Sequence, residues 1–459
     1  MTDSGLALQP RPVPGPVPAW TFPSGDPGRV PDGPETLRVD LPGRRLASLR
    51  LVLQAGAGRE AAGKEGVATL LSRALLEGTR PGGGTELTAA FERLGASLYA
   101  SADLAALRIA LDAPVSRLAP ALELLAAVLR DAALDDGDVR RLVRERLDEI
   151  AQEDADPGTR AMRELRAVLF PPESRAHLPT GGTRASVTGL TGADVRAFYG
   201  SVAPAEAVAV LAGDLAGSGA DEALAAALAG WTTPGPELPA ADELPPADAP
   251  RVVIVDRPGS VQTYLSIAHG VPDRTDADWP LLTVAAHVLG GGLTSRLNAL
   301  LREEKGYTYG VRAGLLRMRG RGVFIAQGSV HTEVTADAVA DGLAVLRSVA
   351  ADGIGDDECA ASVRALADRA PAEYETARAV AAELADAAAS GLGSGYPAAY
   401  LAAVRAATPD AVARAYTGRV DTDALTVVAV GDAAQIREPL ERLGHGPVTV
   451  TAPEAAGAE

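Results

Sequence analysis

The sequence contains a single cysteine, Cys359, among its 459 residues. One cysteine excludes an internal disulfide and any zinc site built from several cysteines, and it indicates a reducing compartment. Asp356, Asp357 and Glu358 directly precede this cysteine and would raise the pKa of its thiol. We therefore expect Cys359 to be chemically inert.

Long apolar runs are absent as well, since no uncharged stretch reaches the roughly 18 residues that a membrane-spanning helix needs. The first twenty residues have no apolar core flanked by basic residues, so we expect no secretory signal and a cytoplasmic location. Basic residues are in the minority, with 43 Lys and Arg against 60 Asp and Glu and a net charge of -17. This balance argues against nucleic acid or an anionic membrane as the main partner.

Histidine is scarce, and no two of the five histidines lie three or four residues apart: His177, His269, His287, His331 and His445. Two histidines one helical turn apart are what a helical zinc site requires, so we expect no metal bound by this chain. A G-x-S-x-G nucleophile elbow is missing too. The glycine runs at 82–84 and 290–292 lack the following Lys-Ser/Thr of a phosphate-binding loop.

The sequence contains 47% hydrophobic residues, which is enough to form hydrophobic cores. Residues 1–34 are rich in proline and glycine and are predicted to form an extended arm. Residues 233–250 are proline-rich and acidic without periodicity, which predicts a semi-rigid linker. The linker places the domain boundary near the middle of the chain.

The two halves carry a repeated pattern. Residues 191–214 and 408–432 both read as a helix with an aromatic residue near its end, a turn, an apolar strand and then Gly-Asp. The offset of roughly 215 to 220 residues indicates the duplication of one large domain rather than a solenoid. The predicted fold class is α+β, with homologous domains at 35–232 and 251–452. Each domain is expected to be a largely antiparallel sheet with helices on one face.

The stretch at 290–310, GGGLTSRLNALLREEKGYTYG, combines several local signals. Gly290, Gly291 and Gly292 lead into a predicted helix at 295–304, Gly306 ends that helix, and residues 307–309 favour a strand. Arg302 and Tyr309 lie seven residues apart, and a helix-turn-strand unit can direct both side chains to one volume. Spacing alone favours an ordinary surface arginine and a strand tyrosine.

The wording G-G-x-x-S-R-L…L-R-E-E-K-G-x-x-Y resembles the C-terminal half of the M16 (insulinase/pitrilysin-like) metallopeptidases, in particular their M16B branch. The resemblance extends over residues 35 to 450 and implies one half of a two-domain clamshell. It also implies that Arg302 and Tyr309 help to bind the substrate and its reacting carbonyl near a zinc ion. Gly290, Gly291 and Gly292 are interpreted as a place of close approach for substrate or partner, with a plain turn as the alternative.

The zinc-binding half of the M16 pattern is degenerate in this chain. Residues 66–79, GVATLLSRALLEGT, resemble the family phrase G-x-x-H-x-x-E-H-x-x-x-x-G-T. Thr69 replaces the first histidine, Ser72 the glutamate base and Arg73 the second histidine. Glu149 matches the family's third ligand, but one carboxylate cannot hold zinc. A solvated helix glutamate is therefore the favoured interpretation of Glu149.

This asymmetry resembles the second subunit of heterodimeric M16B peptidases, in which the partner carries zinc and this type of chain supplies the arginine and tyrosine. The resemblance implies no cofactor in this chain, a zinc-bearing M16B partner and an unfolded peptide substrate. Two alternatives stay open from the sequence. One is a structural subunit without proteolytic function, and the other is a module that binds a peptide without cutting it.

Overall fold

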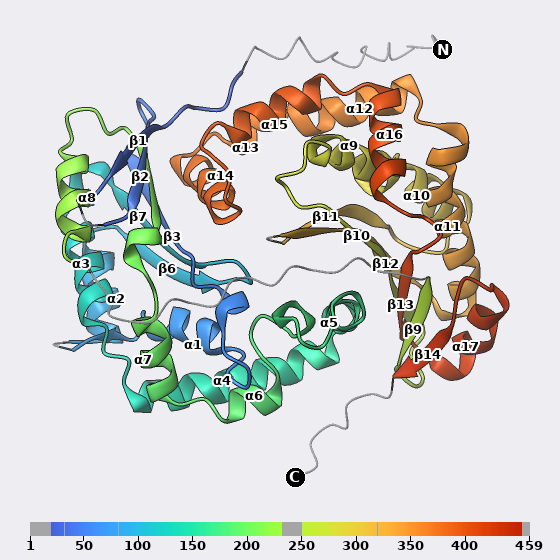
Figure 1. The fold of residues 1–459 in the computed structure, drawn as a ribbon, viewed down its shortest axis with the longest axis horizontal. Coiled ribbons are helices and arrows are strands. Elements are labelled where there is room, and N and C mark those ends of the chain that lie inside the picture. Colours follow the sequence, from blue (N-terminus) through green and yellow to red (C-terminus); the bar gives the residue numbers. More distant parts are fainter. Residues whose placement is uncertain (1–19, 32, 81, 232–249, 319, 452–459) are drawn as a thin grey trace, which may run out of the picture.

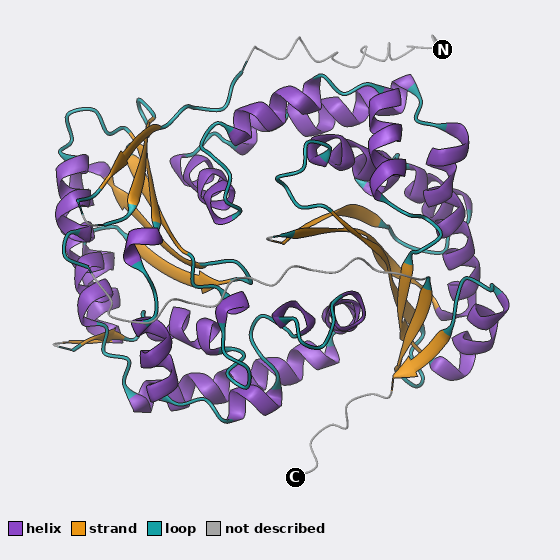
Figure 2. Ribbon diagram, in the orientation of Figure 1, coloured by secondary structure: helices purple, strands orange, loops and turns teal. Residues whose placement is uncertain are grey.

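The computed structural model describes residues 20–231 and 250–451, apart from residues 32, 81 and 319. Residues 1–19 of the predicted arm and residues 233–249 of the predicted linker lie outside the described residues. Two six-stranded sheets, one in each half of the chain, form the framework (Figures 1 and 2). In the described part of the chain, no helix is long and apolar enough to cross a membrane.

The sheet of the N-terminal half has the strand order β1-β2-β8-β3-β7-β6. Strands β2 and β8 run parallel, and all other neighbours in this sheet are antiparallel. The strands are β1 (Asp26–Arg29), β2 (Glu35–Asp40), β3 (Leu46–Leu53), β6 (Ser97–Ala102), β7 (Leu107–Pro114) and β8 (Val208–Gly213). A separate two-stranded ribbon pairs β4 (Gly78–Thr79) with β5 (Gly82–Gly83).

The sheet of the C-terminal half has the order β11-β12-β10-β13-β9-β14. Its strands are β9 (Arg251–Asp256), β10 (Gln262–Val271), β11 (Arg312–Met318), β12 (Arg321–His331), β13 (Thr426–Gly431) and β14 (Val448–Thr451). Five strands repeat the positions and pairings of β2, β8, β3, β7 and β6, including the parallel pair, here β9 with β13. The predicted duplication and the α+β fold class are therefore confirmed, and only the outermost strands, β1 and β14, differ.

Helices surround both sheets. The N-terminal half contributes α1 (Val67–Ala74), α2 (Gly84–Arg93), α3 (Leu118–Asp131), α4 (Asp136–Ala155), α5 (Pro157–Leu169), α6 (Arg184–Thr188), α7 (Gly192–Gly200) and α8 (Ala220–Leu228). The C-terminal half contributes α9 (Trp279–Gly290), α10 (Arg296–Asn298), α11 (Thr335–Asp352), α12 (Asp356–Ala367), α13 (Ala370–Glu373), α14 (Ala377–Ala389), α15 (Tyr396–Arg405), α16 (Pro409–Arg419) and α17 (Ala433–Arg442). Asp156 caps α5 and Pro157 opens it, so α4 ends at this Asp-Pro step.

One helix from each half packs against the sheet of the other half. Helix α5 packs on the C-terminal sheet through Ala161, Leu165 and Leu169, which join a buried cluster with residues of β9, β10, β12 and β13. Helix α14 packs in the same way on β3 and β8 of the N-terminal sheet (Figure 1). The sequence predicts helices on one face of each sheet, but the central strands are buried on both faces. This exchange ties the halves together through apolar burial.

Residues 20–34, which the sequence assigns to an extended arm, partly join the N-terminal domain. Asp26–Arg29 pairs with β2 as the edge strand β1. Trp20 and Phe22 pack against Tyr374 of the C-terminal half, with ring centroids 5.9 and 4.9 Å apart, respectively. The domain boundary at residue 35 therefore lies inside the folded part of the chain. Packing of these aromatic rings stabilises the contact between this segment and the C-terminal half.

Candidate functional site

The degenerate zinc motif lies where two helices of the N-terminal half meet. Thr69, Ser72 and Arg73 lie on α1, and Glu149 lies on the neighbouring helix α4. Arg73 forms a bidentate ion pair with Glu149, with Nη1 to Oε1 at 2.9 Å and Nη2 to Oε2 at 2.7 Å. The fold thus brings together two positions that are 76 residues apart in the sequence. Glu149 is a helix glutamate that is 40% exposed to water, and both of its oxygens also face a guanidinium, a contact that the sequence does not predict.

A second arginine completes this ion network. Arg146 is buried, and its Nη1 donates to Glu149 at 3.1 Å and to Glu153 at 2.6 Å. Hydrogen bonds from Arg73, and secondarily from Arg146, hold the pKa of Glu149 below its usual range. Glu149 is therefore an anion whose oxygens are already occupied by fixed cations.

Zinc does not fit these residues. The Ser72 hydroxyl donates to the Thr69 carbonyl at 2.8 Å, so Ser72 turns back onto its own helix. Arg73 places a positive charge against the only carboxylate of the motif. Within the described residues, no group of three His, Cys, Asp or Glu side chains could hold a metal ion. The motif positions therefore hold an ion pair between Arg73 and Glu149.

Replacing Arg73 with methionine is expected to destabilise the protein by about 0.5 to 1 kcal/mol at pH 7. The estimate is small because Glu149 is 40% exposed and keeps Arg146, so water screens the pair. Since folding lowers the pKa of Glu149, the pair stabilises the protein above the unfolded glutamate pKa and loses this effect as pH falls through the folded pKa.

The difference between wild type and Arg73→Met should therefore shrink below about pH 4. Urea unfolding at pH 7 and at pH 3.5 measures this difference. Arg144→Met, at an exposed arginine of α4, is the matched control for the loss of one charge. A pH-independent difference would indicate that Arg73 acts through packing alone.

The second candidate stretch follows α9 in the C-terminal half. Helix α10 continues into a π-helical turn at Ala299–Glu304, and Gly306 ends it with a φ of +66°. The Tyr307 amide donates to the Leu301 carbonyl at 2.9 Å, the closing bond of a glycine-terminated helix. The predicted end of the helix at Gly306 is confirmed.

The strand predicted at 307–309 is wrong, because β11 begins only at Arg312. The Thr308 hydroxyl donates to the Ser329 carbonyl at 2.6 Å and accepts from the Gly310 amide at 3.0 Å. Asn298 holds the backbone of Val311 from both sides, through bonds of 2.8 and 2.9 Å. These side-chain bonds replace ladder pairing and hold the segment as a loop.

Arg302 and Tyr309 are placed differently from each other. The Arg302 guanidinium lies 3.5 Å from the adjacent Glu303. Tyr309 is 90% exposed and borders a groove of about 780 Å³, whereas Arg302 is not among the residues that line this groove. Among the described contacts, none joins Arg302 to Tyr309. The Tyr309 side chain is therefore accessible to solvent, and no described contact joins it to the Arg302 side chain.

Gly290, Gly291 and Gly292 line the same groove, next to Leu293, which is 68% exposed. A Cβ on Gly290 would lie 2.5 Å from the amide nitrogen of Ala313, and one on Gly291 would lie 2.4 Å from the His287 ring. Only Gly292 has space around it, with its nearest neighbour at 3.9 Å. Gly290 therefore lets α9 approach β11, while Gly292 leaves the groove open.

Sequence reasoning missed several residues of the groove, among them Asn298 and Tyr264. Buried Asn298 fixes the loop through Val311, and Tyr264 of β10 lines the groove from the sheet. A polar amide within the otherwise apolar run LNALL was the available signal for Asn298, because a buried amide needs partners. Tyr264 gave no signal, since an aromatic residue is ordinary in a strand.

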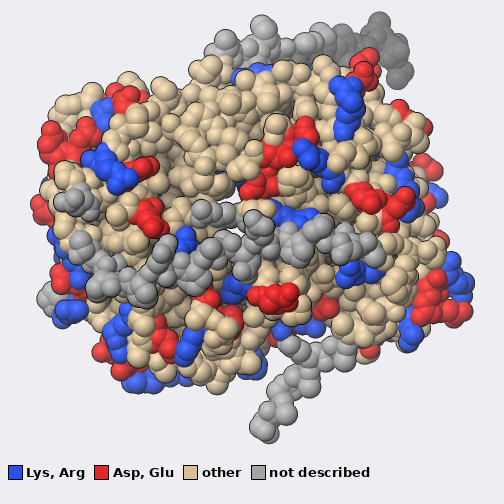
Figure 3. Space-filling view, in the orientation of Figure 1, with Lys and Arg blue, Asp and Glu red and all other residues tan. Residues whose placement is uncertain are grey.

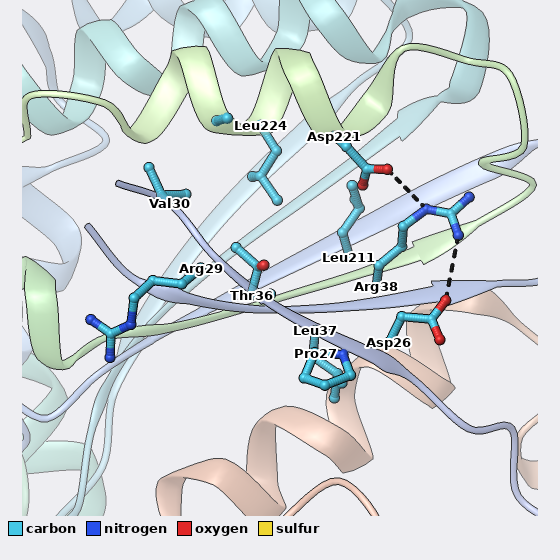
Figure 4. Close-up of a pocket in the computed structure, with 12 residues that line it drawn as sticks. Asp26, Pro27, Arg29, Val30, Thr36, Leu37, Arg38, Leu211, Asp221 and Leu224 are labelled. Atoms are coloured by element: carbon cyan, nitrogen blue, oxygen red, sulfur yellow. Dashed lines mark ion pairs between the residues drawn. The ribbon is translucent and has the colours of Figure 1, made fainter. Parts of the chain in front are cut away.

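A separate cavity of about 470 Å³ lies between the β1-β2 hairpin and α8 (Figure 4). There Arg38 forms ion pairs with Asp221 at 3.3 Å and Asp26 at 3.8 Å. None of the residues predicted as a site lines this cavity. Cys359 is buried on α12, and burial raises the pKa of its thiol, as expected for an inert cysteine.

Comparison with known proteins decides the family. The model of the insulinase family (peptidase family M16) matches residues 37–171, and the model of the peptidase M16 inactive domain matches residues 189–366. The chain belongs to the M16 family of insulinase-like peptidases. The degenerate motif and Glu149 lie in the first matched range, and Arg302 and Tyr309 lie in the second.

Curated relatives share most of their length with this chain. An uncharacterized zinc protease of Mycobacterium tuberculosis is 28% identical over 335 residues, which cover 72% of this chain and 76% of the relative. An uncharacterized zinc protease of Streptomyces coelicolor is 25% identical over 345 residues, covering 73% of this chain and 74% of the relative.

Solved structures share the fold. The peptidase M16 inactive domain from Pseudomonas fluorescens superposes with a TM-score of 0.83 at 24% identity and covers 89% of this chain and 98% of its own. A protease from Helicobacter pylori gives 0.84 at 17% identity, covering 89% and 100%. A chain of complex III2 from Candida albicans gives 0.76 at 16% identity, covering 92% and 100%.

Proposed function

We propose that this chain is the subunit without zinc of a heterodimeric M16B peptidase that cleaves unfolded peptides. One contrast between the two halves carries the proposal. At the degenerate motif, Arg73 forms an ion pair with Glu149, whereas in the other half Tyr309 is exposed beside an open groove. A chain whose zinc-motif positions are closed by an ion pair, but which keeps an exposed tyrosine, matches the part of an active site that needs a partner. The zinc-bearing M16B partner supplies the metal, and this chain carries no cofactor.

In this proposal the residues of this chain hold the substrate. The Tyr309 hydroxyl donates a hydrogen bond to the carbonyl under attack, where negative charge develops. When substrate binds, the Arg302 guanidinium breaks its contact with Glu303. It then orients the Tyr309 side chain or binds the main chain of the substrate. Because the Arg302-Glu303 contact is long and partly exposed, its loss costs little.

The groove suits an extended peptide. Strand β11 is the outermost strand of its sheet, and its first residues, Arg312 and Ala313, line the groove together with the three glycines. An open strand edge can pair with the backbone of a peptide without reading its sequence. This mode fits an unfolded substrate in the cytoplasm, which is the location we propose.

Hydrolysis of a panel of unfolded peptides tests the proposal, with this chain alone, the zinc-bearing partner alone and their mixture. We expect activity only in the mixture and its loss on addition of a chelator. Full activity of the partner alone, unchanged on mixing, would assign this chain a structural role. Chelator-sensitive activity of this chain alone would show that it binds metal itself.

A further inference from the structure

A small cavity in the N-terminal half, apart from the peptide groove, is lined by an arginine that has no counter-ion among the described residues. The cavity has a volume of about 220 Å³ and lies between the end of α4, the helix α5 and the loop at 179–182. Four arginines and two acidic residues line it, so its charged lining has an excess of two positive charges. Positive charges gathered in a recess need partners, because removing a charge from water is costly.

Three of the four arginines have carboxylate partners. Arg146 pairs with Glu153 at 2.6 Å, Arg163 with Asp154 at 2.7 Å, and Arg160 lies 3.9 Å from Glu164. Arg175, which lies behind the cavity, pairs with Glu60 and donates to the carbonyls of the 178–180 segment. The carboxylates around the cavity are thus already committed to other guanidinium groups.

Arg166 is the exception. Its side chain makes one long hydrogen bond, 3.3 Å to the Thr180 hydroxyl, and no ion pair with any described residue. Burial, together with the nearby charge of Arg175, lowers the pKa of Arg166 to about 10. Arg166 still carries its charge at neutral pH, and the Thr180 hydroxyl beside it can donate to an oxygen atom.

We propose that this cavity binds one small oxyanion, a carboxylate or a phosphate, on Arg166 and Thr180. A guanidinium binds such planar or tetrahedral oxyanions through paired N–H donors, and the cavity volume admits a single group of this size rather than a peptide. The oxyanion comes from solution, and inorganic phosphate is the probe for it. The proposal stands apart from the peptidase role, since it involves neither Tyr309 nor a partner chain.

Titration calorimetry of the full chain with inorganic phosphate at pH 7 tests the site, with chloride at equal ionic strength as the blank. We expect one saturable site per chain and a loss of affinity of roughly 10- to 100-fold in Arg166→Met. Arg144→Met, which removes an exposed arginine of α4, should bind phosphate as the wild type does. Equal phosphate affinity in wild type and Arg166→Met would overturn the proposal.

The unfolding temperature of Arg166→Met without phosphate provides a second measurement, because loss of a partly buried charge that has no counter-ion among the described residues should leave this temperature equal or higher. A marked decrease, with no phosphate binding in the wild type, would overturn the proposal.

Discussion

Replacing Tyr309 with phenylalanine is expected to lower the peptide-cleaving rate of the reconstituted complex by roughly a hundred- to a thousand-fold. The change removes one hydroxyl, and the loss of one hydrogen-bond donor to a developing oxyanion typically costs about 2.7 to 4 kcal/mol. Because Tyr309 is 90% exposed, phenylalanine should leave the fold and the assembly with the partner unchanged. Steady-state hydrolysis of a peptide by the mixture, with kcat and KM determined separately, measures the effect.

Tyr307→Phe is the matched control, since Tyr307 lies two residues earlier in the same loop and packs partly against the C-terminal core. It should retain near-normal turnover. A Tyr309→Phe complex with the activity of wild type would exclude a role for this hydroxyl and favour a structural subunit. If only KM rises in Tyr309→Phe, the hydroxyl binds the substrate without stabilising the transition state.

Replacing Glu60 with alanine is expected to destabilise the protein by about 3 to 5 kcal/mol, because it breaks a buried ion pair on one side only. The Glu60 side chain is fully buried and lies 2.7 Å from Nη2 of Arg175. It also accepts hydrogen bonds from the amides of Gly66 and Ala68 at the start of α1, at 3.1 and 2.8 Å. Alanine would leave both the Arg175 charge and these amides without a carboxylate.

Urea unfolding of the full chain, followed by circular dichroism, measures this loss as a shift of the midpoint. Glu92→Ala, at an exposed glutamate of α2, is the control and should change stability by less than about 0.5 kcal/mol. The same effect in both variants would mean that Arg175 is satisfied by the carbonyls of Leu178, Pro179 and Thr180 alone. Glu60 binds the start of α1, and α1 carries Arg73. Loss of Glu60 should therefore also disturb the ion pair between Arg73 and Glu149.

Local sequence patterns, and their repetition in the two halves of the chain, made much of the fold predictable. The apolar strands that end in Gly-Asp begin at Val208 and at Thr426, 218 residues later, and they occupy equivalent positions in the two sheets. The end of the π-helical turn at Gly306 followed from the freedom of glycine at positive φ. The strand expected at 307–309 failed because Thr308 and Asn298 bond to the backbone, which β propensity does not describe.

The sequence named candidate site residues but did not predict their contacts. The resemblance to the M16 motif singled out Arg73 and Glu149, yet the sequence did not reveal that they bind each other, since contact depends on how α1 packs against α4. The same holds for Tyr309 and Arg302, whose seven-residue spacing suggested one shared volume. The π-helical turn and the following loop direct them to different surroundings.

The sequence by itself determined the duplicated α+β architecture and the absence of a histidine pair for zinc, because these depend on residue types and on local periodicity. Only the tertiary structure decided the exchange of α5 and α14 between the sheets, the pairing of Arg73 with Glu149 and the lack of a counter-ion for Arg166 among the described residues. These features depend on which surfaces meet across long stretches of chain. Burial then sets the energetic cost of each charge, and that cost is not encoded in any one segment.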